Sequence, residues 1–175
     1  MNSSTAPSSG QTLGVDASGN VITIPNAATA SVSTQEVSIG GSGPAQSSNK
    51  FDVNDTGWTT VKNSNQTVIV PAGGRAVFIN FMLGIDYISN PPGGGGGYYT
   101  AKLYIDGVAT NVFLTAQEPT YGAQAQFSLS TVKALTEGSH TIEVRMSRTY
   151  NNGTTAGAEM TCAMMSMSLN SSYIN

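Results

Sequence analysis

Charged residues, cysteine and histidine are all scarce in this sequence. Only 10% of the 175 residues are charged, whereas typical domains carry about 25%. The net charge of -3 offers no positive field to phosphate groups, so we expect no nucleic acid partner. Cys162 is the single cysteine, which excludes an intrachain disulfide and a four-cysteine metal site. The core must therefore be held together by burial alone.

Catalytic and metal-binding patterns are also missing. His140 is the only histidine and lies at the start of an apolar strand pattern, so we interpret it as a hydrogen-bonded structural residue and Cys162 as packing. No spacing of the carboxylates indicates the converging pair that glycoside hydrolysis needs. Residues 93–97 are all glycine, but Tyr98 and Tyr99 follow them in place of Gly-Lys-Ser/Thr, so a phosphate loop is not indicated. We expect no enzymatic activity, no cofactor and no metal.

Long apolar runs are absent as well. No segment approaches the roughly 20 apolar residues that span a bilayer, and the first residues show neither a basic run nor an apolar stretch. We therefore expect no membrane partner, no transmembrane segment and no signal peptide.

Aromatic residues are missing from the first 50 positions, and Phe51 is the first ring. This change in composition predicts two parts: an extended N-terminal arm over residues 1–50 and a folded domain over residues 51–175. The arm is either a disordered tail or a segment that orders by adding strands to the sheet edge of a partner. Its candidate partner-binding residues are Val21, Ile22, Ile24, Val32, Val37 and Ile39.

Short β-rich segments separated by turn signals fill the second part. We expect strands at 58–61, 66–70, 75–83, 99–106, 108–115, 123–132, 139–148 and 158–169. Asp106-Gly107 predicts a tight hairpin, and Asp52 to Asp55 read as a turn. No segment shows a helical pattern of useful length. The fold class predicted is all-β: an antiparallel β-sandwich, specifically a jelly roll of about eight strands.

Two of these strands are apolar on both faces. Phe78 and Met82 lie opposite the apolar odd-numbered positions of segment 77–83, and the last strand changes its apolar phase between Met164 and Met165. Such a change indicates a β-bulge or burial on both faces. Methionine fills core gaps and also serves interfaces, so both readings stay open. The candidate oligomer-interface residues are Phe78, Met82, Met160, Met164, Met165 and Met167.

Tyrosines flank the glycine-rich segment. Tyrosine beside glycine is typical of recognition loops because the ring binds at low entropic cost. The candidate recognition residues are Tyr87, Tyr98, Tyr99 and Tyr121; the alternative is an ordinary surface loop with incidental tyrosines.

Three segments carry a resemblance to a known family: residues 58–61, 67–74 and 135–144. They resemble the tumour-necrosis-factor/C1q-like trimeric jelly rolls of tailed-bacteriophage virion proteins. The resemblance implies a homotrimer in which residues 160–169 face the threefold axis. It also implies a structural protein of the virion surface, a capsid decoration (cement) protein bound to the major capsid protein or another virion protein. The alternative is a fibre-head adhesin that recognises host surface glycans.

Overall fold

The computed structural model describes residues 12–24, 30–38, 49–88, 97–117, 124–151, 153 and 155–174. Its regular elements are β-strands, and none of the described residues belongs to a helix long and apolar enough to span a membrane. The strands are β1 (Thr12–Val15), β2 (Val21–Ile24), β3 (Ala30–Ser38), β4 (Lys50–Val53), β5 (Thr59–Val70), β6 (Arg75–Tyr87), β7 (Gly97–Ile105), β8 (Val108–Gln117), β9 (Gln124–Leu135), β10 (Gly138–Asn151) and β11 (Met160–Ile174).

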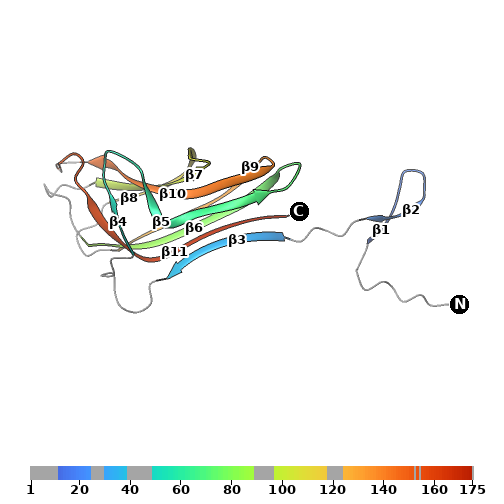
Figure 1. Ribbon diagram of the computed structural model, residues 1–175, viewed down its shortest axis with the longest axis horizontal. Helices are drawn as coiled ribbons and strands as arrows, with labels where there is room; N and C mark the ends of the chain where they lie inside the picture. Colours follow the sequence, from blue (N-terminus) through green and yellow to red (C-terminus); the bar gives the residue numbers. More distant parts are fainter. Residues whose placement is uncertain are drawn as a thin grey trace.

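Strands β4 to β11 form two antiparallel sheets that pack face to face (Figure 1). One sheet has the order β5-β10-β7-β8, and the other has the order β4-β11-β6-β9. Neighbours within each sheet are mostly distant in the sequence, because the chain crosses between the sheets after most strands, as in a jelly roll. The prediction of an eight-stranded antiparallel sandwich is therefore confirmed.

Two of the eight expected strands differ from those observed. The segments expected at 58–61 and 66–70 are one strand, β5, which continues through an irregular residue, Asn63, with φ of 63°. Conversely, β4 includes Asp52 and Val53, which were expected to form a turn. The side chain of Val53 is fully buried, and a buried apolar anchor outweighs the turn preference of the residues around it.

The strand β3 lies on the arm side of the boundary expected at residue 50, yet it pairs with this chain's own sheet. Its residues pair with β11 from Ser38↔Ser166 to Ala30↔Ile174, and β4 pairs with the preceding part of β11, from Lys50↔Ala163 to Val53↔Met160. Figure 1 shows β3 running beside β11 along the edge of the sandwich. Along most of its length, the backbone groups of β11 that do not face β6 thus pair with β3 or β4. This pairing protects a long strand edge from association with other chains.

Period-2 alternation builds the core between the two sheets. On β6, Val77, Ile79, Phe81, Leu83 and Ile85 point inward and are at most 2% exposed, while the residues between them face outward. Ile142, Val144 and Met146 of β10 face them from the other sheet and are fully buried. Each large side chain buried in this way contributes roughly 1.5–3 kcal/mol. This layer replaces the disulfides that the sequence excludes.

A β-bulge interrupts the last strand. The register of β11 against β6 shifts between Met164 and Ser166, so of the two readings of the methionine pattern, a bulge or burial on both faces, the structure has the bulge. Residues before the shift point inward at even positions, as Met160 and Met164 do, and residues after it point inward at odd positions, as Met167 and Leu169 do. The bulge therefore keeps the large apolar side chains of both halves on the core side.

A buried serine repairs a second irregularity, where β5 meets β10. The register shifts between Glu143 and Arg145, beside the positive φ of Asn63. There the Ser64 hydroxyl donates to the carbonyl oxygen of Val144 over 2.9 Å and accepts from the Val144 amide over 3.1 Å. Ser64 is fully buried, so its side chain supplies the two hydrogen bonds that a neighbouring backbone would otherwise supply.

Replacing Ser64 with alanine should leave both backbone groups of Val144 without this partner inside the protein. We expect Ser64→Ala to lower the free energy of unfolding by about 1–3 kcal/mol. Chemical denaturation measures the change, with Ser139→Ala, at an exposed position of β10, as the matched control. Equal stability of the two variants would contradict this role for the Ser64 hydroxyl.

Candidate functional site

The central part of the outer side of the β11-β6-β9 sheet has no charged side chain, and we call it the uncharged face; Asp86 of β6 and Glu36 of β3, which pairs with Ser168, lie at its borders. It consists of the outward side chains of three strand segments, 76–84 of β6, 126–134 of β9 and 166–172 of β11, and each of them is neutral. They are Ala76, Phe78, Asn80, Met82, Gly84, Gln126, Ser128, Ser130, Val132, Ala134, Ser166, Ser168, Asn170 and Ser172. The lack of charge is one feature that this face shares with the cores of protein interfaces.

Apolar and polar residues alternate across this face in rows set by the strand register. Phe78, Val132 and Ser172 form one row, and Met82, Ser128 and Ser168 form another. Phe78, Met82 and Val132 are 44%, 60% and 51% exposed, so three large apolar side chains stand open to solvent. The outward orientation predicted for Phe78 and Met82 is thus observed.

The row between them is polar and internally hydrogen-bonded. The Ser130 hydroxyl donates to Oδ1 of Asn80 over 2.7 Å, and the Asn170 amide donates to the Ser168 hydroxyl, also over 2.7 Å. These bonds occupy one atom of each amide, Oδ1 of Asn80 and Nδ2 of Asn170, and so lower the desolvation cost of covering the row.

A hollow of ≈ 450 Å³ opens beside Gly84 on this face. Its lining includes Met82, Gln126, Ser128 and Ser166. The absence of a side chain at Gly84 keeps the hollow open, since a Cβ there would lie 3.1 Å from the Ser166 hydroxyl. An apolar side chain from a partner would find both space and Met82 in it.

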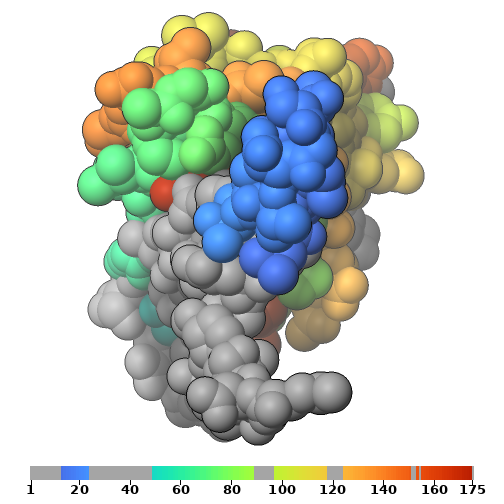
Figure 2. Space-filling model, turned by 90° about the vertical axis from the view of Figure 1, so that its right-hand side faces the viewer, coloured from blue at the N-terminus to red at the C-terminus, as the bar shows by residue number. Residues whose placement is uncertain are grey.

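The arm carries a second apolar surface, on the hairpin of β1 and β2. Its turn is closed by Asp16, whose Oδ1 accepts from the amides of Ser18 and Asn20, each over 2.9 Å. The hydrogen bonds from the backbone and the side chain of Asn20 are the largest cause that lowers the pKa of Asp16 below its ordinary 3.8. The hairpin is drawn apart from the sandwich in Figure 1 and stands in front of it in Figure 2.

The exposed side chains of this hairpin are unusually apolar. Leu13, Val15 and Val21 are 66%, 68% and 70% exposed, and Ile22 is 42% exposed. The pair Val15↔Val21 is directly opposed, and Leu13 lies two residues along the same face. A two-stranded hairpin alone is marginal in water, so this one gains stability when its apolar face is covered.

The remaining predicted arm residues are only partly described. Val32 and Val37 lie on β3 and Ile24 ends β2, but the described part of the chain does not include their side chains. Ile39 lies outside the described residues altogether. Val21 and Ile22 are therefore the members of this set whose side chains are placed.

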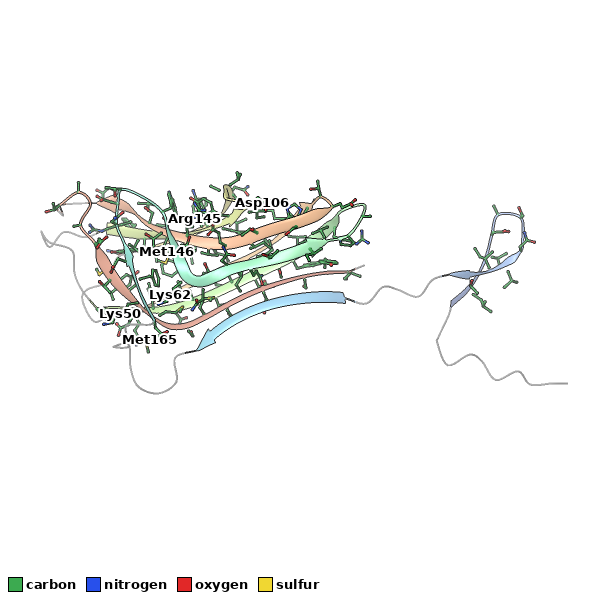
Figure 3. All side chains as sticks on the ribbon, in the orientation of Figure 1. Lys50, Lys62, Asp106, Arg145, Met146 and Met165 are labelled. Atoms are coloured by element: carbon green, nitrogen blue, oxygen red, sulfur yellow. The ribbon has the colours of Figure 1, made fainter. Side chains whose placement is uncertain are left out.

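The prediction that the methionines of β11 form an oligomer interface is wrong for three of them. Met160, Met164 and Met167 are at most 1% exposed and lie in the core between the sheets, as does Leu169. Residues 160–169 therefore do not present a common apolar face to a symmetry axis. The bulge is the reason, because it turns the second half of the strand so that its large side chains also face inward. Met165 is half-buried and lies at the bend of β11 (Figure 3).

The prediction of a recognition surface is wrong for two of the four tyrosines. Tyr87 and Tyr99 are fully buried, and their ring centroids lie 5.1 Å apart in the core. Both belong to strands, and each has the inward phase of its neighbours, Ile85 on β6 and Ala101 on β7. Tyr98 is 41% exposed on the outer side of β7, where its ring meets that of Tyr150. Tyr121 lies outside the described residues.

His140 has the structural role expected of it and joins two turns at one end of the sandwich. Its Nδ1 lies 2.7 Å from Oδ2 of Asp106, in the β7–β8 turn, and its Nε2 lies 2.9 Å from the carbonyl oxygen of Thr136, before β10. Both partners are acceptors, so the doubly protonated ring satisfies both. The hydrogen bond to Asp106, followed by that to Thr136, raises the pKa of His140 above its ordinary 6.5. The hydrogen bond from His140, followed by that from the Thr141 amide, lowers the pKa of Asp106 below 3.8.

Among the described residues, no three His, Cys, Asp or Glu side chains come close enough to hold a metal ion. The geometry thus offers two apolar surfaces, the uncharged face and the β1–β2 hairpin, each suited to association with protein.

Comparisons with known proteins give likenesses of structure only. No family model and no curated protein sequence matches the chain. Two structures of infectious bursal disease virus, of the Gx and Gt strains, are 19% and 15% identical. The match covers 92% and 93% of this chain, with TM-scores of 0.48 and 0.49. This chain spans only 35% and 39% of those viral chains.

A weaker likeness is to the stem and receptor-binding domain of spike protein P1 from bacteriophage PM2. It has 11% identity, covers 63% of this chain and 56% of that one, and has a TM-score of 0.29. Carbohydrate-active enzymes also match, with TM-scores of 0.30, 0.32 and 0.35. Likenesses this weak leave the function to be argued from the surfaces of this chain.

The pair of His140 and Asp106 predicts a bell-shaped dependence of stability on pH. The raised pKa of His140 means that its contribution is fully present below pH 6.5 and is lost as the pH rises through the raised value. The lowered pKa of Asp106 means that its contribution is present above pH 3.8 and is lost as the pH falls through the lowered value. Solvent screens this exposed pair, so we expect at most about 1 kcal/mol. Urea denaturation should show a lower free energy of unfolding at about pH 8.5 than at about pH 5 for the native chain, but not for His140→Gln. An equal decrease in both proteins would contradict this role of the pair.

Proposed function

We propose that this chain is a non-enzymatic structural protein of a virion, a decoration protein that attaches to the shell by its arm. The observation that carries the proposal is the β1–β2 hairpin with Leu13, Val15 and Val21 exposed side by side. A free protein gains nothing from such a surface, whereas an assembled one buries it. The resemblance of residues 58–61, 67–74 and 135–144 to phage virion jelly rolls supports the same function.

Two interactions would contribute to the binding of the arm to the shell. Burial of three or four aliphatic side chains supplies the hydrophobic term, and the free edges of β1 and β2 can extend a sheet of the shell protein by backbone hydrogen bonds. Neither term needs charge, which agrees with the low charge of the chain. Attachment of this kind stabilises the shell by bridging its subunits.

The sandwich itself would associate as a homotrimer through the uncharged face. Phe78, Met82 and Val132 supply exposed apolar area, and the polar row between Phe78 and Met82 has part of its hydrogen bonding internally satisfied. The hollow beside Gly84 offers a place for a side chain of the next copy. In this proposal the contact surface is the outer side of the sheet and no longer the methionines of β11.

Removal of residues 1–24 should abolish attachment to shells stripped of this protein and leave the sandwich folded. The truncation stops before β3, because β3 covers the edge of β11 and its loss would destabilise the domain. Cosedimentation with the shells measures attachment, and thermal unfolding monitors the fold. Attachment by the truncated chain at native affinity would contradict the proposed role of the arm.

A point variant provides a finer comparison at the same site. Val21→Asp places a charge within the apolar face of the hairpin, and Val108→Asp makes the same change at the start of β8. The two valines are 70% and 68% exposed, so the variants are matched in solvent accessibility and differ only in their position. Only the first should weaken cosedimentation.

Replacing Met82 by aspartate should convert the trimer to a folded monomer. A buried, unpaired carboxylate on the uncharged face would cost several kcal/mol at each contact. Sedimentation velocity measures the oligomeric state, and Ile69→Asp, at a position 72% exposed on the outer side of β5, is the control. A native chain that sediments as a monomer, or a trimer that persists in Met82→Asp, would contradict this interface.

A further inference from the structure

The opposite outer surface, on the β5-β10-β7-β8 sheet, has a different character. We call it the ring face, and it carries aromatic rings together with cations. The Lys102 ammonium lies 4.8 Å from the ring centroid of Trp58 and 5.4 Å from that of Phe113. The Trp58 and Tyr104 centroids are 6.1 Å apart, and Phe113 is 56% exposed. One cluster of rings therefore surrounds a cation at the middle of the sheet.

A second group of rings lies farther along the same strands. Tyr98 and Tyr150 pair directly across β7 and β10, with ring centroids 5.7 Å apart and planes at 62°. They are 41% and 55% exposed. Tyr98 precedes Lys102 by four residues on β7, which corresponds to about 13 Å along a strand. Two aromatic surfaces thus stand at a fixed separation on a rigid sheet.

Hydroxyl groups line the surface between the two clusters. Thr100 lies midway on β7, and its hydroxyl is 2.8 Å from that of Thr115 on β8 and 2.7 Å from that of Thr149 on β10. A hydroxyl can donate one hydrogen bond and accept two, so this chain of three retains capacity for a ligand. The two outer threonines are exposed.

The two cations beside the rings differ in their partners. Arg145 forms an ion pair with Glu143, whose other oxygen accepts from the Thr60 hydroxyl over 3.0 Å, and its guanidinium lies 4.3 Å from the Tyr104 ring. Figure 3 shows Arg145 and Met146 on opposite sides of β10. No ion pair is found for Lys102 among the side chains that the structure describes. Its ammonium is thus the charge beside the rings that an anionic ligand can neutralise.

We propose that the ring face binds an acidic oligosaccharide. Sugar rings stack on exposed aromatic side chains, their hydroxyls pair with hydroxyls, and a carboxylate complements the Lys102 ammonium beside the rings. The spacing of about 13 Å between the clusters suits a short chain of sugars better than one sugar. This site does not depend on the proposed attachment to a shell, since it lies on the other sheet from the uncharged face and shares no residue with the hairpin.

Single-stranded nucleic acid also stacks on aromatic side chains, but the charge of the site does not suit it. A nucleic acid presents one phosphate for every base, so binding needs a row of cations that follows the backbone. The ring face offers few cations outside its ion pair, Lys102 within the ring cluster and Lys62 on β5, on a chain of net charge -3. One carboxylate among neutral hydroxyls is the better match.

The test is a binding assay of the full chain against printed oligosaccharides. Oligogalacturonates, oligoguluronates and sialylated oligosaccharides are printed, each beside its carboxyl-reduced form, together with single-stranded DNA. We expect binding to at least one acidic oligosaccharide and about ten-fold weaker binding to its reduced form. Phe113→Ala and Tyr98→Ala should each weaken binding about ten-fold, as loss of one stacking ring does.

Ile69→Ala provides the control, since Ile69 is 72% exposed on the outer side of β5 and belongs to neither ring cluster. It should leave oligosaccharide binding unchanged, and Phe113→Ala should leave the oligomeric state unchanged. Absence of binding to every acidic oligosaccharide overturns the proposal, as does binding that both ring variants retain. Equal binding of the carboxyl-reduced forms overturns the role of Lys102, and preferential binding of the DNA assigns the face to nucleic acid instead. None of these results bears on attachment by the arm, which is measured with shells.

Discussion

The phase shift in β11 determines which surfaces of this molecule are apolar. Ahead of the bulge the strand places Met160 and Met164 inward, and without the shift Met167 and Leu169 would point to solvent. Ser166, Ser168 and Asn170 would then enter the core, where their polar groups would lack partners. One extra residue in the strand thus completes the core and creates a smooth, hydroxyl-rich outer surface. The uncharged face depends on this shift, because its third strand would otherwise be a row of methionine and leucine.

The two outer surfaces follow from the same alternation with different residues. Outward positions are neutral over residues 76–84 of β6, 126–134 of β9 and 166–172 of β11, whereas those on β7, β8 and β10 include rings, Lys102 and Arg145. Association between copies favours the first kind of surface because little solvation is lost. Recognition of a polar ligand favours the second, where rings give area and a few groups give direction. One sandwich can therefore carry a protein contact on one side and a ligand site on the other.

The fold could be predicted from the sequence more completely than the sites. Alternation in segments 75–83 and 139–148 and the Asp106-Gly107 turn specify strands and a hairpin locally, and the methionine pattern indicated a bulge as one of two readings. The same local rule places Tyr87 and Tyr99 inward, since each continues the phase of buried neighbours, but their position near the glycine-rich segment suggested a recognition surface instead. Whether Met167 faces the core or the solvent could not be predicted, because this depends on how the bulge in β11 packs against the opposite sheet. The contacts of Lys102 with Trp58 and Phe113 could not be predicted from the sequence, because these residues lie on strands that only the register of the sheet brings together.

The short connection between β2 and β3 limits where the arm can act. Residues 25–29 link the hairpin to Ala30, and a fully extended chain of this length reaches only about 20 Å. Ala30 pairs with Ile174, at the same end of the sandwich as the turns that His140 joins. An arm fixed to a shell would therefore hold that end toward the shell and direct the opposite end outward. Tyr98 and Tyr150 lie toward this outward end, because β7 runs from Gly97 there to Ile105 beside the His140 turns. The attachment proposed for the arm would thus leave the Tyr98 and Tyr150 end of the ring face pointing away from the shell.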